Sequence, residues 1–71
     1  MAETFKEVLR RVAWDAEEMA SVADTVGDGD IKAHCKQAAD DLRNAAKQAP
    51  DTELSSYVDR AGNTRYYLPG G

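Results

Sequence analysis

Apolar side chains recur at alternating intervals of four and three residues from position 5 to position 26, and this spacing constrains the fold most strongly. Such a heptad repeat lines up along one side of an α-helix, where a second helix has to cover it. The repeat consists of Phe5, Leu9, Val12, Ala16, Met19, Ala23 and Val26, flanked by Val8, Ala13 and Ala20. We therefore predict a first helix over about residues 3–26.

A second apolar repeat predicts a second helix, over about residues 30–49. Its members are Ile31, Cys35, Ala38, Leu42, Ala45 and Ala49. Gly27 suits the left-handed conformation that ends a helix, and Asp28 and Asp30 offer side-chain oxygens that can cap the next one. Pro50 then stops the second helix. The two helices should form an antiparallel hairpin with its turn at residues 27–30.

The two repeats also predict how the helices face each other. In a tight hairpin Met19 lies opposite Cys35, and Ala16 lies opposite Ala38 near the middle. Because a pair of alanines adds little bulk, we expect the two backbones to approach most closely there.

The C-terminal third has a different character. We predict a connector over residues 50–56, a short β-hairpin over 57–68 and a tail over 69–71. Aromatic and β-branched residues flank a turn in which Asp59 and Gly62 suit a type I turn followed by a bulge. Two strands alone are marginal in water, so the hairpin should pack on the helices. The whole chain is expected to be one mainly α domain.

Trp14 departs from the apolar repeat. At 100° per residue it lies on the side of the first helix opposite Phe5. We expect the C-terminal hairpin to cover the indole, using aromatic or leucine side chains of the tail. These are Tyr57, Tyr66, Tyr67 and Leu68. The alternative is that Trp14 is an exposed anchor for a partner, because tryptophan is enriched at binding hot spots.

Residues with catalytic or metal-binding potential are few. His34 and Cys35 are the only histidine and cysteine, and neighbours on a helix point about 100° apart, so they do not form a nucleophile–base pair. The aspartates around Gly27 do not follow the calcium-loop order. No phosphate-binding loop, dinucleotide fingerprint or catalytic triad occurs. We therefore expect no enzymatic activity, cofactor or metal.

The N-terminal residues show neither the basic nor the apolar region of a secretory signal, and a single cysteine excludes an internal disulfide. The longest uninterrupted apolar run, residues 12–14, is too short to cross a membrane. These features predict a cytoplasmic protein without a membrane anchor.

Charge divides the two helices. The chain has 9 basic and 13 acidic residues, a net charge of −4. The first helix should present an acidic surface that includes Glu7, Glu17 and Glu18. The second helix carries a narrow basic stripe, made of Lys32, Lys36, Arg43 and Lys47. The negative net charge argues against tight direct binding to DNA.

We therefore expect a small acidic protein-binding module that acts as an inhibitor of a basic or nucleic-acid-binding surface. Its predicted contact residues are Glu7, Trp14, Glu17, Glu18, Tyr57, Tyr66 and Tyr67. In size, acidity and lack of catalytic motifs the chain resembles phage-encoded anti-defence inhibitors, anti-CRISPR proteins among them. Two alternatives stay open. One is an assembly protein that forms a helical homo-oligomer such as a homodimer, and the other is a ligand or nucleotide binder that uses the basic stripe.

Overall fold

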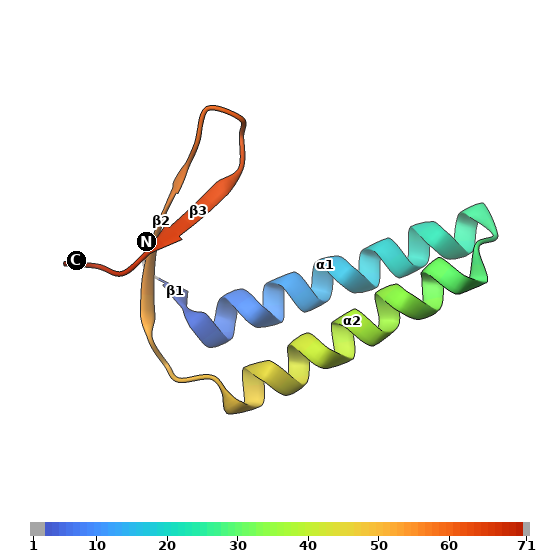
Figure 1. Cartoon of the computed structure of the whole chain (residues 1–71), viewed down its shortest axis with the longest axis horizontal. Coiled ribbons are helices and arrows are strands. Elements are labelled where there is room, and N and C mark those ends of the chain that lie inside the picture. Colours follow the sequence, from blue (N-terminus) through green and yellow to red (C-terminus); the bar gives the residue numbers. More distant parts are fainter. Residues whose placement is uncertain (1–2, 71) are drawn as a thin grey trace.

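The computed structural model describes residues 3–70 and confirms the predicted fold class of a helical hairpin with a C-terminal β-hairpin. Helices α1 (Phe5–Val26) and α2 (Gly29–Gln48) lie side by side (Figure 1). An antiparallel sheet in the order β1-β2-β3 stands at one end of them. Its strands are β1 (Glu3–Thr4), β2 (Glu53–Val58) and β3 (Thr64–Tyr67).

The turn between the helices forms as its residues predict. Gly27 has the left-handed φ of 87° and donates its backbone N–H to the carbonyl oxygens of Ala23 and Asp24. The N–H of Asp28 also bonds to the Ala23 carbonyl, at 2.9 Å, which completes a Schellman motif. The Asp28 side chain then caps α2 by accepting the N–H of Ile31 at 3.0 Å.

The start of α1 differs from the prediction, because Glu3 and Thr4 belong to a short strand. Thr4 is the N-cap and forms a capping box with Glu7, in which each side chain accepts the other residue's backbone N–H at 3.2 Å. Strand β1 pairs with β2 through Glu3 opposite Leu54. The predicted connector is therefore shorter than 50–56, because β2 begins at Glu53.

The β-hairpin turn follows its sequence signature. Gly62 has a φ of 84°, and its N–H bonds to the Asp59 carbonyl at 3.0 Å. The Asp59 carboxylate accepts the N–H groups of Ala61 and Asn63 and the Nε–H of Arg65, each at 2.9 Å. The hydrogen bond from Asn63, followed by that from Arg65, lowers the pKa of Asp59 below its ordinary value.

This lowered pKa predicts how the turn responds to acid. A carboxyl whose folded pKa is depressed stabilises the fold above its unfolded pKa of about 4 and loses that contribution as pH falls through the folded value. We expect the amide NMR signals of Ala61 and Asn63 to titrate with a midpoint below that value, and the titration to vanish in Asp59→Asn. A midpoint at or above the unfolded pKa would contradict the hydrogen-bonded turn.

The helix–helix contact is rotated relative to the predicted one. Its buried side chains form what we call the alanine seam, Ala13, Ala20, Ala23, Ala39 and Ala46. Ala38 is exposed and Ala39 is 0% exposed, so the predicted pairing of Ala16 with Ala38 is wrong. Small side chains in the seam let the helices pack closely. Leu9 and Leu42 of the predicted repeat stay half-buried, whereas its other large apolar residues are exposed, namely Phe5, Val12, Met19, Val26 and Ile31.

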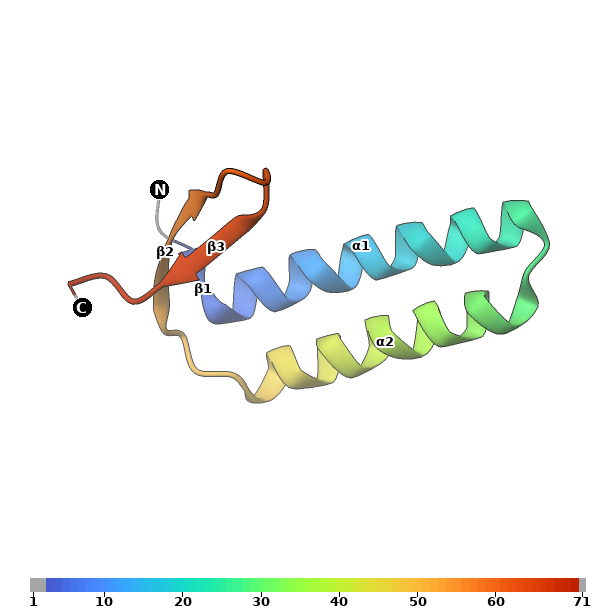
Figure 2. The ribbon, with the colours of Figure 1, turned by 45° about the horizontal axis from the view of Figure 1, so that its top comes forward.

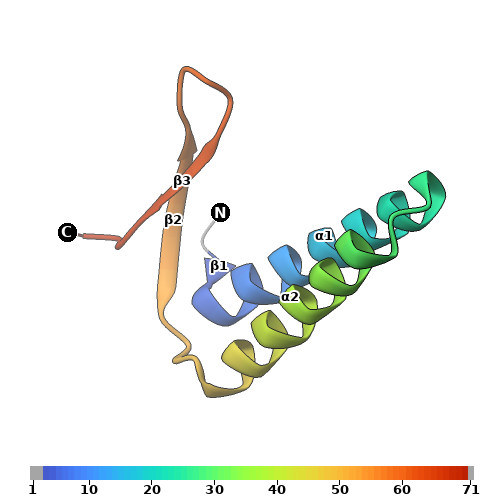
Figure 3. The ribbon, with the colours of Figure 1, turned by 45° about the vertical axis from the view of Figure 1, so that its right-hand side comes forward.

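The molecule is a single layer. Its Cα positions extend over 46 × 32 × 14 Å, and the shortest of these is the viewing direction of Figure 1. The sheet extends from the side of α1 that faces away from α2, as Figure 2 and Figure 3 show from two further directions. The sheet nevertheless reaches Val12 of α1, which lines a hollow of about 550 Å³ together with Tyr57, Val58 and Tyr66. Neither helix in the described residues combines the length and the apolarity that crossing a bilayer would need.

Candidate functional site

Trp14 lies in an open groove between the two helices. The groove has a volume of about 370 Å³ and is lined by Arg10, Trp14, Arg43 and Lys47, which we call the tryptophan groove. Trp14 as a whole residue is 64% exposed. The prediction that the β-hairpin covers Trp14 is therefore wrong, because the sheet extends from another side of α1. The alternative, an exposed tryptophan, is what the structure has.

The cations of the groove differ in how they are held. Arg43 bridges the two helices by pairing with Glu17 at 2.8 Å, and it also lies 3.5 Å from Asp40. No ion pair within the described residues involves Arg10 or Lys47. Two positive charges therefore flank the indole without a paired carboxylate, while Arg43 is fixed in place.

The predicted acidic surface and basic stripe partly neutralise each other, because α1 and α2 bring them together. Besides the Glu17–Arg43 pair, Asp24 accepts a hydrogen bond from Lys32 at 2.9 Å. This contact lowers the pKa of Asp24. Both pairs are solvent-exposed and each contributes little to stability, but they set the charge that a partner meets.

The other predicted contact residues fall into separate places. Glu7 belongs to the capping box, and exposed Glu18 takes part in none of the ion pairs formed by residues 3–70. Lys36 lines a neighbouring polar hollow with Lys32 and Asp24. Trp14 and Glu17 are thus the predicted contact residues that lie against cations of the basic stripe.

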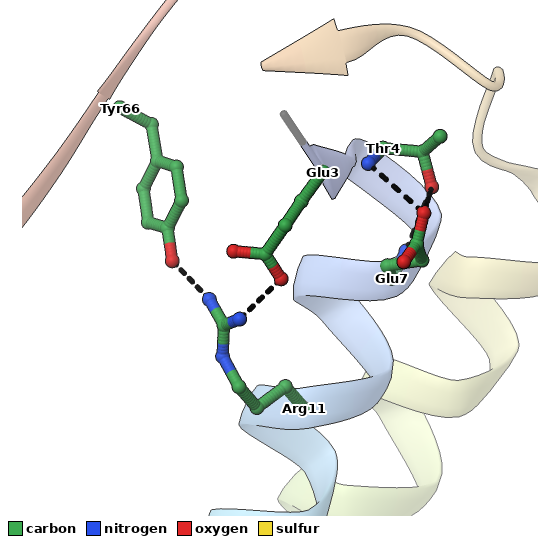
Figure 4. A network of polar contacts seen from close by, with 5 residues as sticks. All are labelled: Glu3, Thr4, Glu7, Arg11 and Tyr66. Carbon is green, nitrogen blue, oxygen red and sulfur yellow. Dashed lines mark hydrogen bonds and ion pairs between the residues drawn. The ribbon is translucent and has the colours of Figure 1, made fainter. Parts of the chain in front are cut away.

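The tyrosines belong to the sheet and lie away from Trp14. The guanidinium of Arg11 donates hydrogen bonds to the Glu3 carboxylate and to the Tyr66 hydroxyl, which ties α1 to β1 and β3 (Figure 4). The bond to Glu3 raises the pKa of Arg11. Tyr57 and Tyr67 form a tilted pair with ring centroids 6.1 Å apart, and both are at least half exposed.

Sequence reasoning missed a second exposed surface. Phe5, Val12, Met19 and Val26 recur every seven residues of α1, and all four are exposed. Ile31, Ala38 and Ala45 repeat with the same period on α2 and are also exposed. We call these seven residues the apolar face. The seven-residue spacing of these apolar side chains is visible in the sequence, but it was interpreted as the contact between the two helices.

The residues with chemical potential are dispersed. His34 is exposed and Cys35 is half-buried in α2. Within residues 3–70 no three His, Cys, Asp or Glu side chains gather as metal ligands. What the structure does place together is an aromatic ring with cations on one surface and apolar side chains on another.

Comparison of the chain with protein-family models, with curated proteins and with solved structures gives no match. The function of this chain therefore has to be inferred from its own surfaces. The tryptophan groove and the apolar face are the two surfaces that a binding function can use.

Proposed function

We propose that this chain is a non-enzymatic protein-interaction module of the cytoplasm that acts as an inhibitor by occupying a partner's surface, with the tryptophan groove as its contact site. The exposure of Trp14 beside three cations carries the proposal. Tryptophan and arginine are the residues most enriched among binding hot spots, where a few side chains supply most of the affinity. The single cysteine supports a reducing compartment.

The charge around Trp14 favours an acidic partner segment. Arg43 is fixed by Glu17, whereas Lys47 and Arg10 can pair with carboxylates of the partner. An aromatic or aliphatic side chain among those carboxylates would cover the indole. Such electrostatic complementarity would act mainly on the association rate, and burial of the indole would act on the dissociation rate.

Trp14→Ala is the direct test of this site. We expect the variant to fold, because the indole is exposed, and to lose at least about thirty-fold in affinity for a partner captured by the wild type from host lysate. Leu68→Ala is the matched control, since Leu68 is similarly exposed but follows β3 and does not line the tryptophan groove. Equal capture of the same proteins by both variants would contradict the proposal.

A second candidate is the basic partner surface predicted from composition. The net charge of −4 and the exposed Glu18 favour it. Charge reversal separates the two candidates. With an acidic partner Lys47→Glu should slow association and Glu18→Lys should not, whereas a basic partner reverses both results. Association rates at two salt concentrations, measured for the captured partner, decide between them.

A further inference from the structure

The buried part of the isolated chain is unusually poor in large side chains. Of the described residues that are buried, five are alanines and one is Val8. Burying a large apolar side chain contributes about 1.5–3 kcal/mol, and an alanine contributes much less. A chain of 71 residues buries little surface and therefore has a small free energy of unfolding. Small domains often gain stability by association.

The large apolar side chains that could have formed a core lie instead on the apolar face. Met19 is 53% exposed, Ile31 is 52% exposed and Val26 is 77% exposed. Together with Val22, Ala23 and Asp28 these three line a shallow hollow of about 240 Å³ near the turn between the helices. Along both helices the heptad positions of this face carry no charged residue. A surface of this kind is typical of a helix contact that lacks its partner.

We propose that a second copy of this chain covers the apolar face, so that two hairpins pack face to face as a four-helix bundle. The proposal concerns the face of the hairpin opposite Trp14 and does not depend on the function proposed for the tryptophan groove. Compact domains are built from at least two packed layers, and this chain supplies one, with a thickness of 14 Å. A second copy supplies the other layer with the same heptad spacing, as four-helix bundles require.

The broad face of the two helices sets an upper limit on the contact area of such a dimer, because the sheet shares the hollow beside Val12. Helix α1 has 22 residues and is therefore about 33 Å long. Two adjacent helices make a surface about 18 Å wide, so each copy would bury about 600 Å² and the pair about 1,200 Å². That total reaches the lower end of the range found for stable, specific interfaces. A two-fold dimer uses the same patch on both copies, so the apolar side chains of one copy would meet those of the other.

Trp14 would stay accessible in this dimer. At 100° per residue it lies about 150° around α1 from the middle of the apolar face. The residues that share its groove, Arg10, Arg43 and Lys47, lie on the same side of the helical layer. A face-to-face dimer would therefore present two tryptophan grooves, one on each outer surface.

Sedimentation equilibrium of the full chain over a wide concentration range tests the dimer. We expect twice the 7.7 kDa chain mass at high concentration, and a melting temperature that rises with concentration. Met19→Glu places a charge in the middle of the apolar face and should weaken association at least a hundred-fold, while Met19→Leu should keep it. Ser21→Glu puts the same charge on an exposed position of the opposite face and is the matched control.

Three results would overturn the dimer. The first is a mass of one chain at every concentration, which would leave the apolar face to a different protein partner. The second is a dimer that Met19→Glu leaves intact, and the third is one that Ser21→Glu dissociates, because either would place the contact elsewhere. If Met19→Glu does not fold, the dilution series of the wild type still decides, since only an associating protein has a concentration-dependent melting temperature.

Discussion

Ala39→Leu is expected to lower the free energy of unfolding by about 1–3 kcal/mol, the usual cost of forcing extra carbon atoms into a packed contact. Ala39 is 0% exposed and lies in the alanine seam, where no larger side chain is buried. Each kcal/mol shifts the melting temperature of a domain of this size by about 4–8 °C. Thermal melts recorded at one protein concentration measure the effect.

Ala33→Leu is the control for this substitution. Ala33 is in the same helix but exposed, so the added carbon atoms remain in water and the melting temperature should stay nearly constant. Alanine and leucine both have high helix propensity, so the comparison of the two variants isolates the effect of packing between the helices. Equal melting temperatures for the two variants would contradict the alanine seam.

Arg11→Met should weaken the attachment of the sheet to the helices while leaving the helical hairpin folded. Arg11 donates to both Glu3 and Tyr66 (Figure 4), and among the described residues its bond to Tyr66 is the side-chain hydrogen bond that joins α1 to β3. The capping box of Thr4 and Glu7 also joins β1 to α1. Because the Arg11 side chain is 45% exposed, we discount its bonds to about 1 kcal/mol. Amide hydrogen exchange in β2 and β3 should therefore accelerate about five-fold.

Two further variants make that result specific. Arg10→Met removes a guanidinium from the preceding residue of the same helix, which lines the tryptophan groove. It should leave hydrogen exchange in the sheet unchanged. Tyr66→Phe removes only the hydroxyl that accepts from Arg11 and should reproduce part of the effect. Unchanged exchange in both Arg11→Met and Tyr66→Phe would show that the bonds of Arg11 do not hold the sheet in place.

Local signals in the sequence predicted the fold well because they act over a few residues. Gly27 and Asp28 end one helix and start the next, and Asp59 and Gly62 form the β-hairpin turn, each through its own backbone and side-chain bonds. The two-residue strand β1 was missed, because its pairing with β2 joins segments about fifty residues apart. Nothing in Glu3 and Thr4 alone distinguishes that strand from the first turn of a helix.

Side-chain packing was harder to predict. The apolar repeat around Val12 and Met19 and the alanine repeat around Ala13 and Ala20 run beside each other on the same helix, offset by one residue. Hydrophobicity favours the first as the contact, but close packing of the two helices selects the second. Packing of the helices through the alanine repeat also determines the candidate sites. It leaves the apolar face exposed and places Trp14 beside the basic residues of α2.

The central claim is that the helical hairpin has two different exposed surfaces, with Trp14 on one and the apolar face on the other. Trp14 is the only tryptophan, so acrylamide quenching of its fluorescence reports on that surface alone. We predict strong quenching with the same constant from the lowest to the highest protein concentration, across the range in which the proposed dimer would form. A quenching constant that falls as the dimer forms would place Trp14 inside the interface and contradict the account.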